Sequence, residues 1–165
     1  MIDIVHIFLS QGHNFLGHFG QAPGTHPILE CETVECVAGR GLRGDRYFDH
    51  KENYKGQVTF FAHETYMELG HAFGVTDCDP STFRRNIITR GLDLNTLIGR
   101  QFIIDGIHFE GVEECRPCLW MDQAFTPGAN RWLEGRGGLR ARILSNGWLK
   151  RGVGVSLEIL DATLA

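Results

Sequence analysis

Alternation of hydrophobic and polar side chains predicts β-strands along much of the chain. Residues 102–104 and 107–110 are two such runs, and Asp105 and Gly106 separate them. An Asp-Gly pair in this position is the strongest short signal for a β-hairpin, because the turn needs a positive φ. The apolar run at residues 1–9 also predicts a first core strand.

A second hairpin is predicted near the end of the chain. Alternating residues 139–143 lead to Asn146 and Gly147, which suit a tight turn, and residues 153–159 alternate again. The 21 glycines are spaced in the rhythm of many short strands. Many short strands and few helices predict a mainly β fold, a β-barrel or strongly bent sheet, in a single domain over residues 1–165.

One helix is clearly predicted. Apolar residues recur at helical spacing from Ala62 to Phe73, and Gly74 follows as a natural stop. The strand-like residues 58–61 come directly before it. Two weaker helical stretches are predicted at residues 119–124 and 130–134.

Composition and charge narrow the classes of function. The chain is 42% hydrophobic and 22% charged, as in ordinary globular proteins. A net charge of -4 provides no basic field for a nucleic-acid backbone, so no nucleic-acid partner is expected. No segment is long enough to span a membrane, and residues 1–9 lack the basic start of a signal peptide. We therefore expect a cytoplasmic protein whose five cysteines are free thiols.

Residues 115–118, with the sequence Cys-Arg-Pro-Cys, are the most informative segment. A structural zinc site would usually show a second pair of ligands, and a thioredoxin-like redox pair would need a βαβ setting. A third interpretation is one reactive thiolate, because Arg116 lies between the two cysteines in sequence and a cation lowers a thiol pKa. The structural alternative is two buried cysteines that act as small hydrophobic residues.

Arginines recur in the glycine-rich segments, residues 39–46 and 135–142. If residues 83–88 form a strand, Arg84 and Asn86 share one face, where a guanidinium and an amide can hold an anion. In an acidic protein this recurrence predicts positive charge gathered around one pocket. The alternative for each segment is a solvated loop or edge strand. Three histidines match no metal-binding spacing and are interpreted as polar surface residues: His13, His18 and His26.

Taken in order, four motifs resemble those of the MOSC domain. They are Gly-Asp-Arg at 44–46, Phe-Arg-Arg-Asn-Ile at 83–87, Leu-Ile-Gly at 97–99 and Cys-Arg-Pro-Cys at 115–118. This domain occurs in molybdenum cofactor sulfurases, in mitochondrial amidoxime-reducing components and in small stand-alone bacterial proteins. The resemblance covers residues 39–160, and the size matches the stand-alone type. It implies a β-barrel-like fold and a site for the molybdenum cofactor (molybdopterin) or for sulfur transfer.

The resemblance also implies roles for individual residues. Cys118 matches the metal ligand of the amidoxime-reducing branch, so it would be the catalytic thiolate, ligating molybdenum or carrying sulfur. Arg85 stands where that branch has a proline. One departure is the final strand, where residues 152–155 lack the acid found in many members. The cofactor-binding residues expected are Arg84, Asn86, Asp45, Arg46 and Arg140.

Three functions remain open at this point. The first is a stand-alone MOSC protein that reduces N-hydroxylated compounds with the help of electron-donor proteins. The second is a carrier that takes sulfur or the anionic cofactor from a donor protein without turnover. The chain shows neither the pyridoxal-phosphate domain of the sulfurases nor the N-terminal β-rich domain of the reductases. The third is a small domain with a structural zinc or dithiol pair.

Overall fold

The computed structural model describes residues 1–15 and 21–160, and this part of the chain is mainly β with three short α-helices. The strands are β1 (Ile2–Leu9), β2 (Leu29–Glu30), β3 (Thr33–Val37), β4 (Gly41–Leu42), β5 (Val58–Ala62), β6 (Ile87–Arg90), β7 (Gln101–Ile104), β8 (Ile107–Glu114), β9 (Leu139–Ile143), β10 (Gly147–Lys150), β11 (Gly152–Val155) and β12 (Leu157–Ile159). The helices are α1 (His63–Phe73), α2 (Trp120–Ala124) and α3 (Ala129–Trp132), and the 3-10 turns are η1 (Pro80–Phe83) and η2 (Leu94–Leu97).

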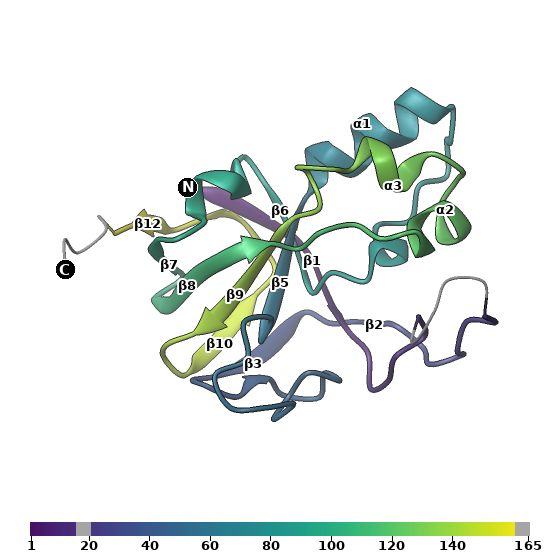
Figure 1. The fold of residues 1–165 in the computed structure, drawn as a ribbon. Coiled ribbons are helices and arrows are strands. Elements are labelled where there is room, and N and C mark those ends of the chain that lie inside the picture. Colours follow the sequence, from purple (N-terminus) through teal and green to yellow (C-terminus); the bar gives the residue numbers. More distant parts are fainter. Residues whose placement is uncertain (16–20, 161–165) are drawn as a thin grey trace.

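Two sheets organise the strands (Figure 1). The larger has the order β11-β1-β6-β5-β9-β8-β7-β12, and β2 adds to β1. β5 and β6 are parallel, and the other pairs in this sheet are antiparallel. The smaller sheet has the order β10-β3-β4. The three α-helices lie together on one side of the large sheet (Figure 1).

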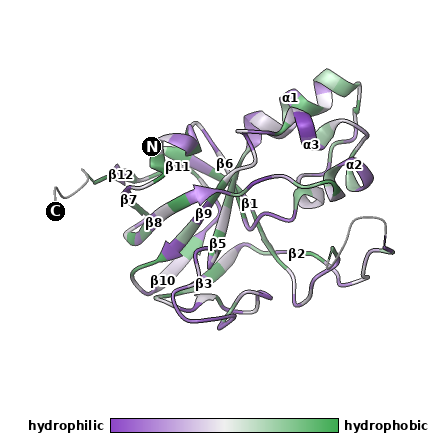
Figure 2. Cartoon of the chain, in the orientation of Figure 1, coloured by the Kyte–Doolittle hydropathy of each residue, from purple (hydrophilic) through white to green (hydrophobic). Residues whose placement is uncertain are grey.

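The core consists of two clusters, one on each face of the central strand β5. Phe60 belongs to the cluster between the sheets, and Phe61 belongs to the cluster beneath the helices. Both side chains are fully buried, as expected for a strand covered on both faces. Figure 2 shows the corresponding hydrophobic stretches along β1 and β5.

The first predicted hairpin and the predicted helix are confirmed. β7 and β8 are joined by Asp105 and Gly106, whose φ angles are 50° and 78°. α1 ends at Phe73 and is capped by Gly74, which has φ 67° and whose N–H donates to the carbonyl oxygens of Gly70 and His71. The predicted first strand and the strand before α1 are also present, as β1 and β5.

The second predicted hairpin is wrong. β9 already has β5 on one edge and β8 on the other, so its backbone has no free edge for a hairpin partner. The side chain of Asn146 instead accepts the N–H of Ala38 at 2.8 Å. Gly147 begins β10, which pairs with β3 in the small sheet.

The condition that residues 83–88 form one strand is not met, because only Ile87 and Ile88 belong to a strand, β6. The side chain of Asp79 accepts the N–H of Ser81 at 2.8 Å and starts the 3-10 turn η1. Arg84 ends that turn in the left-handed region, with φ 54°, and β6 begins only at Ile87. The segment is therefore a tight turn that aims its side chains in different directions.

The expected closed barrel is not formed in the described residues. The hydrogen-bonded path of the large sheet ends at β11 and β12, which do not pair with each other. These two strands follow one another along the chain, with Ser156 between them, and pair with β1 and β7 respectively. The two ends of the path are thus joined through the chain, and the sheet stays open.

Candidate functional site

A cavity of about 280 Å³ brings both cysteines of residues 115–118 together with five arginines. The arginines come from the loop after β4, the turn before β6, the loop after β8, and β9 itself. They are Arg46, Arg84, Arg85, Arg116 and Arg140. In a chain of net charge -4, this is a strong local concentration of positive charge.

Arg84 has a buried nitrogen that the described protein leaves without a partner. Its Nη2 donates to the hydroxyl of Ser10 at 3.3 Å and to the carbonyl oxygen of Gly12 at 2.9 Å. Its Nη1 is buried and has no hydrogen-bond partner within the described chain. Burial and the neighbouring Arg46 lower the pKa of Arg84 to about 10, so it still carries a charge at neutral pH. A buried, unpartnered cationic N–H is well suited to an anionic ligand.

Arg46 lies beside Arg84 and is held by long contacts. Its Nη1 is 3.5 Å from a carboxylate oxygen of Asp45, and its Nη2 donates to the carbonyl oxygen of Arg84 at 3.4 Å. The guanidinium also lies over the ring of Tyr47, 4.9 Å from the centroid. Because these contacts are long, several donors of Arg46 retain capacity for a ligand.

Asn86 and Asp45 lie behind the cavity wall rather than in it. The side-chain oxygen of Asn86 accepts the backbone N–H and the hydroxyl of Thr59, at 3.1 and 2.9 Å. Its NH₂ group donates to the carbonyl oxygen of Phe8 and to Asp45, both at 3.2 Å. Every hydrogen-bonding position of this amide is therefore filled by protein. Asp45, also buried, further accepts the N–H groups of Ser10 and Tyr47.

Arg140 links the cysteine loop to an acidic residue. Its Nη1 donates to Glu113 at 3.0 Å, and Lys55 binds the same carboxylate oxygen at 2.7 Å. Burial lowers the pKa of Arg140, but hydrogen bonding and charge interaction with Cys115, together with Tyr54 and Glu113, raise it overall. Arg140 thus remains a cation between Cys115 and Glu113.

The five cysteines differ in access. Cys118 is exposed and Cys115 is buried, although both line the cavity. Burial raises the pKa of Cys31, of Cys36 to about 12 and of Cys78 to about 11. These three thiols stay protonated at neutral pH and lie away from the cavity. Cys118 is therefore the accessible thiol of the site.

His13 is a cavity residue, not the polar surface residue that the sequence predicted, and Tyr54 is a cavity residue that the sequence did not indicate. His13 lines the cavity and contacts Tyr47 edge-on, with ring centroids 5.1 Å apart. Its pKa is lowered by burial and by nearby cations, Arg46 among them. Tyr54 also lines the cavity, and burial together with Tyr47 raises its pKa to about 12, so it stays a neutral phenol. No spacing in the sequence marks either residue, because the site forms only when distant loops meet.

The remaining histidines and arginines lie elsewhere. His26 is exposed, as predicted, and His18 falls outside the described residues. The other arginines of the two glycine-rich segments are in ion pairs with carboxylates outside the cavity: Arg40 with Asp49, Arg43 with Glu35, Arg136 with Glu68 and Arg142 with Glu110. Each glycine-rich segment thus contributes a single arginine to the cavity.

Residues 1–15 and 21–160 give no support for a structural metal site. No group of three or more His, Cys, Asp and Glu side chains there could hold a metal ion. In the same residues, no helix has the length and apolar character needed to cross a bilayer.

Comparison with known proteins gives the family. A model of the MOSC domain matches residues 39–156. The fold is similar to the YuaD protein from Bacillus subtilis, with a TM-score of 0.77 and 16% identity over 96% of each chain. It is also similar to YiiM from Geobacillus stearothermophilus, with a TM-score of 0.69 and 13% identity over 96% of this chain and 75% of that one.

YiiM from Escherichia coli is similar as well, with a TM-score of 0.65 and 15% identity over 97% of this chain and 68% of that one. No curated protein matches the chain. The family match contains the cavity arginines, both cysteines of residues 115–118 and the buried Asp45–Asn86 pair. The chain belongs to the MOSC domain family.

Proposed function

We propose that the cavity binds the molybdenum cofactor and that Cys118 is its protein ligand or carries a sulfur atom for it. The observation that carries this proposal is the buried, unpartnered Nη1 of Arg84, in a cavity with four more arginines and one exposed thiol. Such a site matches a ligand with several negative charges and a soft metal or sulfur centre.

The residues present fit this cofactor. Its phosphate and dithiolene groups are anionic, and Arg84 and Arg46 offer donors that the protein does not fully use. A thiolate is a soft ligand and a good sulfur nucleophile, so Cys118 suits either task. When bound, the cofactor supplies a redox-active molybdenum that can exchange electrons and an oxygen atom with a substrate.

Reduction of N-hydroxylated compounds is the reaction that we propose for a catalytic form of the site. Tyr54 supports it, because a phenol that stays protonated can donate a hydrogen bond to a substrate oxygen. The electrons would come from separate electron-donor proteins. Since all five cysteines are free thiols, a reducing compartment such as the cytoplasm fits the chain.

A carrier without turnover is the second candidate, and the exposure of the cysteine loop favours it. Cys118 is exposed, and the side chain of the next residue, Leu119, is 52% exposed. A partner protein could therefore reach the thiol directly and give or take sulfur or the cofactor.

Metal and pterin analysis of the purified protein tests the proposal. Protein from a host that makes the molybdenum cofactor should contain molybdenum and a fluorescent pterin. Cys118→Ser should lower both contents by about tenfold or more, because the only proposed protein–metal bond is lost. Cys115→Ser should lose less, and Cys78→Ser, outside the cavity, should match the wild type.

The outcomes separate the candidates. Equal loss from the Cys115 and Cys118 variants, or loss from neither, would contradict the role of Cys118. Protein without molybdenum, but with one added sulfur atom on Cys118 by intact mass spectrometry, would establish the carrier instead.

A further inference from the structure

One guanidinium joins three separate segments at the edge of the cavity. Arg85 donates from Nε to the carbonyl oxygen of Gly137 at 3.0 Å and from Nη1 to that of Phe83 at 2.9 Å. Its Nη2 donates to the carbonyl oxygen of Cys115 at 2.9 Å. All three nitrogens of Arg85 therefore serve backbone carbonyl groups, in contrast with Arg84 next to it.

The cysteine loop, residues 115–118, is docked closely against the glycine loop, residues 135–138. The N–H of Cys115 donates to the carbonyl oxygen of Gly138 at 2.8 Å, and the N–H of Gly137 donates to the side chain of Glu114 at 3.1 Å. A Cβ atom at Gly137 would come within 2.3 Å of the carbonyl oxygen of Cys115. The two backbones are thus in contact, and Arg85 bridges them.

The cysteine loop is held more firmly at Cys115 than at Cys118. The N–H and the carbonyl oxygen of Cys115 are both bound to this framework, and its side chain is 5% exposed. For Cys118, the one backbone hydrogen bond found among residues 1–15 and 21–160 is at its carbonyl oxygen, which accepts the N–H of Met121 in α2, and its side chain is exposed. The two thiols of the loop thus differ both in how their backbones are held and in how far they are exposed.

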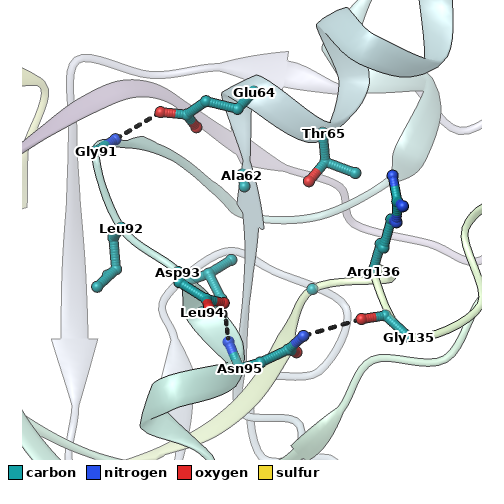
Figure 3. A pocket seen from close by; sticks show the side chains of 11 residues that line it. Ala62, Glu64, Thr65, Gly91, Leu92, Asp93, Leu94, Asn95, Gly135 and Arg136 are labelled. Atoms are coloured by element: carbon teal, nitrogen blue, oxygen red, sulfur yellow. Dashed lines mark hydrogen bonds between the residues drawn. The ribbon is translucent and has the colours of Figure 1, made fainter. Parts of the chain in front are cut away.

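The far side of the glycine loop provides a matched control. A separate cavity of about 350 Å³ lies there, and Figure 3 shows Gly135 and Arg136 on its wall. The amide of Asn95 donates to the carbonyl oxygen of Gly135 at 3.0 Å. The guanidinium of Arg136 lies over the ring of Trp132, 4.5 Å from its centroid, and pairs with Glu68. Arg136 thus belongs to the same loop but does not bind the cysteine loop.

We propose that Arg85 is a positioning residue of the site, which fixes the backbone of Cys115 against Gly137 so that Cys118 is the accessible thiol of the cavity. We call the three hydrogen bonds of Arg85 the clamp. The inference rests on the proposed function in taking Cys118 as the working thiol. A planar guanidinium spreads its donors over a rigid fork of three nitrogens and so spans carbonyl groups of three segments, whereas the three donors of a lysine ammonium sit on a single atom. The hydrogen bonds of Arg85 therefore hold the cysteine loop in a fixed position against the glycine loop.

Alkylation of the protein without cofactor tests this directly. Wild-type protein is treated with iodoacetamide, and the labelling rates of Cys115 and Cys118 are measured by peptide mass spectrometry. We expect Cys118 to react about tenfold or more faster than Cys115, because exposure controls access of the reagent. Arg85→Met should narrow this ratio to about threefold or less, while Arg136→Met should leave it unchanged. Cys36, which is fully buried, reports in the same spectra whether each variant is folded.

Three results would overturn the inference: an unchanged ratio in folded Arg85→Met, an equal change in Arg136→Met, or a wild-type protein whose two cysteines react alike. If Arg85→Met labels Cys36 and so is not folded, Arg85→Lys decides. If the Cys118-to-Cys115 labelling ratio of Arg85→Lys falls below that of the wild type but stays above about threefold, the clamp is supported. If the ratio equals that of the wild type, the inference is overturned. Because the alkylation test uses no cofactor, its result is independent of the metal and pterin analysis. The inference about Arg85 and the proposed function can therefore fail separately.

Discussion

Arg84 and Asn86 are two residues apart, yet their side chains differ in how far the protein satisfies their hydrogen-bonding groups. The amide of Asn86 has all its hydrogen-bonding positions filled by Thr59, Phe8 and Asp45. The guanidinium of Arg84 keeps one buried nitrogen without a partner among the described residues. We infer that Arg84 binds the ligand, whereas Asn86 holds Asp45 in the position that orients Arg46.

This division predicts that Asn86→Ala damages the protein even without a ligand. The substitution leaves the buried Thr59 hydroxyl and the Asp45 carboxylate short of partners. Because each buried unpaired group costs about 1–3 kcal/mol, the free energy of unfolding should fall by roughly 2–4 kcal/mol. Urea denaturation of cofactor-free protein measures it. Asn146→Ala, which removes one exposed hydrogen bond to Ala38, should cost about 1 kcal/mol or less. If both variants were equally stable, Asn86 would not be a structural hub.

At the scale of elements, local signals predicted turns and ends well. Asp105 and Gly106 adopt positive φ in the hairpin turn, and Gly74 adopts the left-handed conformation that caps α1. The turn and the helix end can therefore be predicted from the residue types at those positions. Strand partners are not local information. Asn146 and Gly147 read as a hairpin turn, but β9 is already paired on both edges. A strand over residues 83–88 would place Arg84 and Asn86 on one face, but the 3-10 turn that Asp79 caps ends at Phe83, Arg84 takes a left-handed φ, and β6 begins only at Ile87.

The contact between the glycine loop and the cysteine loop predicts a strong effect of Gly137→Ala. Gly137 does not have a positive φ, so the substitution acts only through its Cβ atom, 2.3 Å from the carbonyl oxygen of Cys115. Separating the two backbones should cost about 1–3 kcal/mol of unfolding free energy, as overpacking does. It should also speed the alkylation of Cys115.

Gly152→Ala is the matched control for this substitution. Gly152 also lacks a positive φ, and an added Cβ would meet only Val155, at an ordinary 3.4 Å. We expect its unfolding free energy to stay within about 0.5 kcal/mol of the wild-type value. Thermal and urea denaturation measure both variants. A Gly137→Ala protein as stable as Gly152→Ala, with Cys115 still protected, would show that the loops are not in firm contact.

At the scale of the whole molecule, charge is distributed unevenly. The chain has a net charge of -4, but five arginines from distant segments line one cavity. The sequence predicted that basic loops would meet around a pocket, and each glycine-rich segment does bring one arginine to the cavity. It could not predict which arginines would be inside. Arg43 and Arg46 are three residues apart, but Arg43 pairs with the carboxylate of Glu35 while Arg46 turns inward.

This asymmetry predicts selective stabilisation of the cofactor-free protein by a multivalent anion. Inorganic phosphate that binds the folded state at ten times its Kd should add about 1.4 kcal/mol of stability. Arg84→Ala and Arg46→Ala should lose most of this gain, because their donors face the cavity. Arg43→Ala should keep it, because its guanidinium is paired with Glu35 on the surface. Thermal denaturation with phosphate, compared with chloride at equal ionic strength, measures the effect and removes the contribution of screening. Equal stabilisation by chloride, or an equal loss in Arg43→Ala and Arg84→Ala, would mean that the arginines act only as a diffuse surface charge and that the cavity is not an anion site.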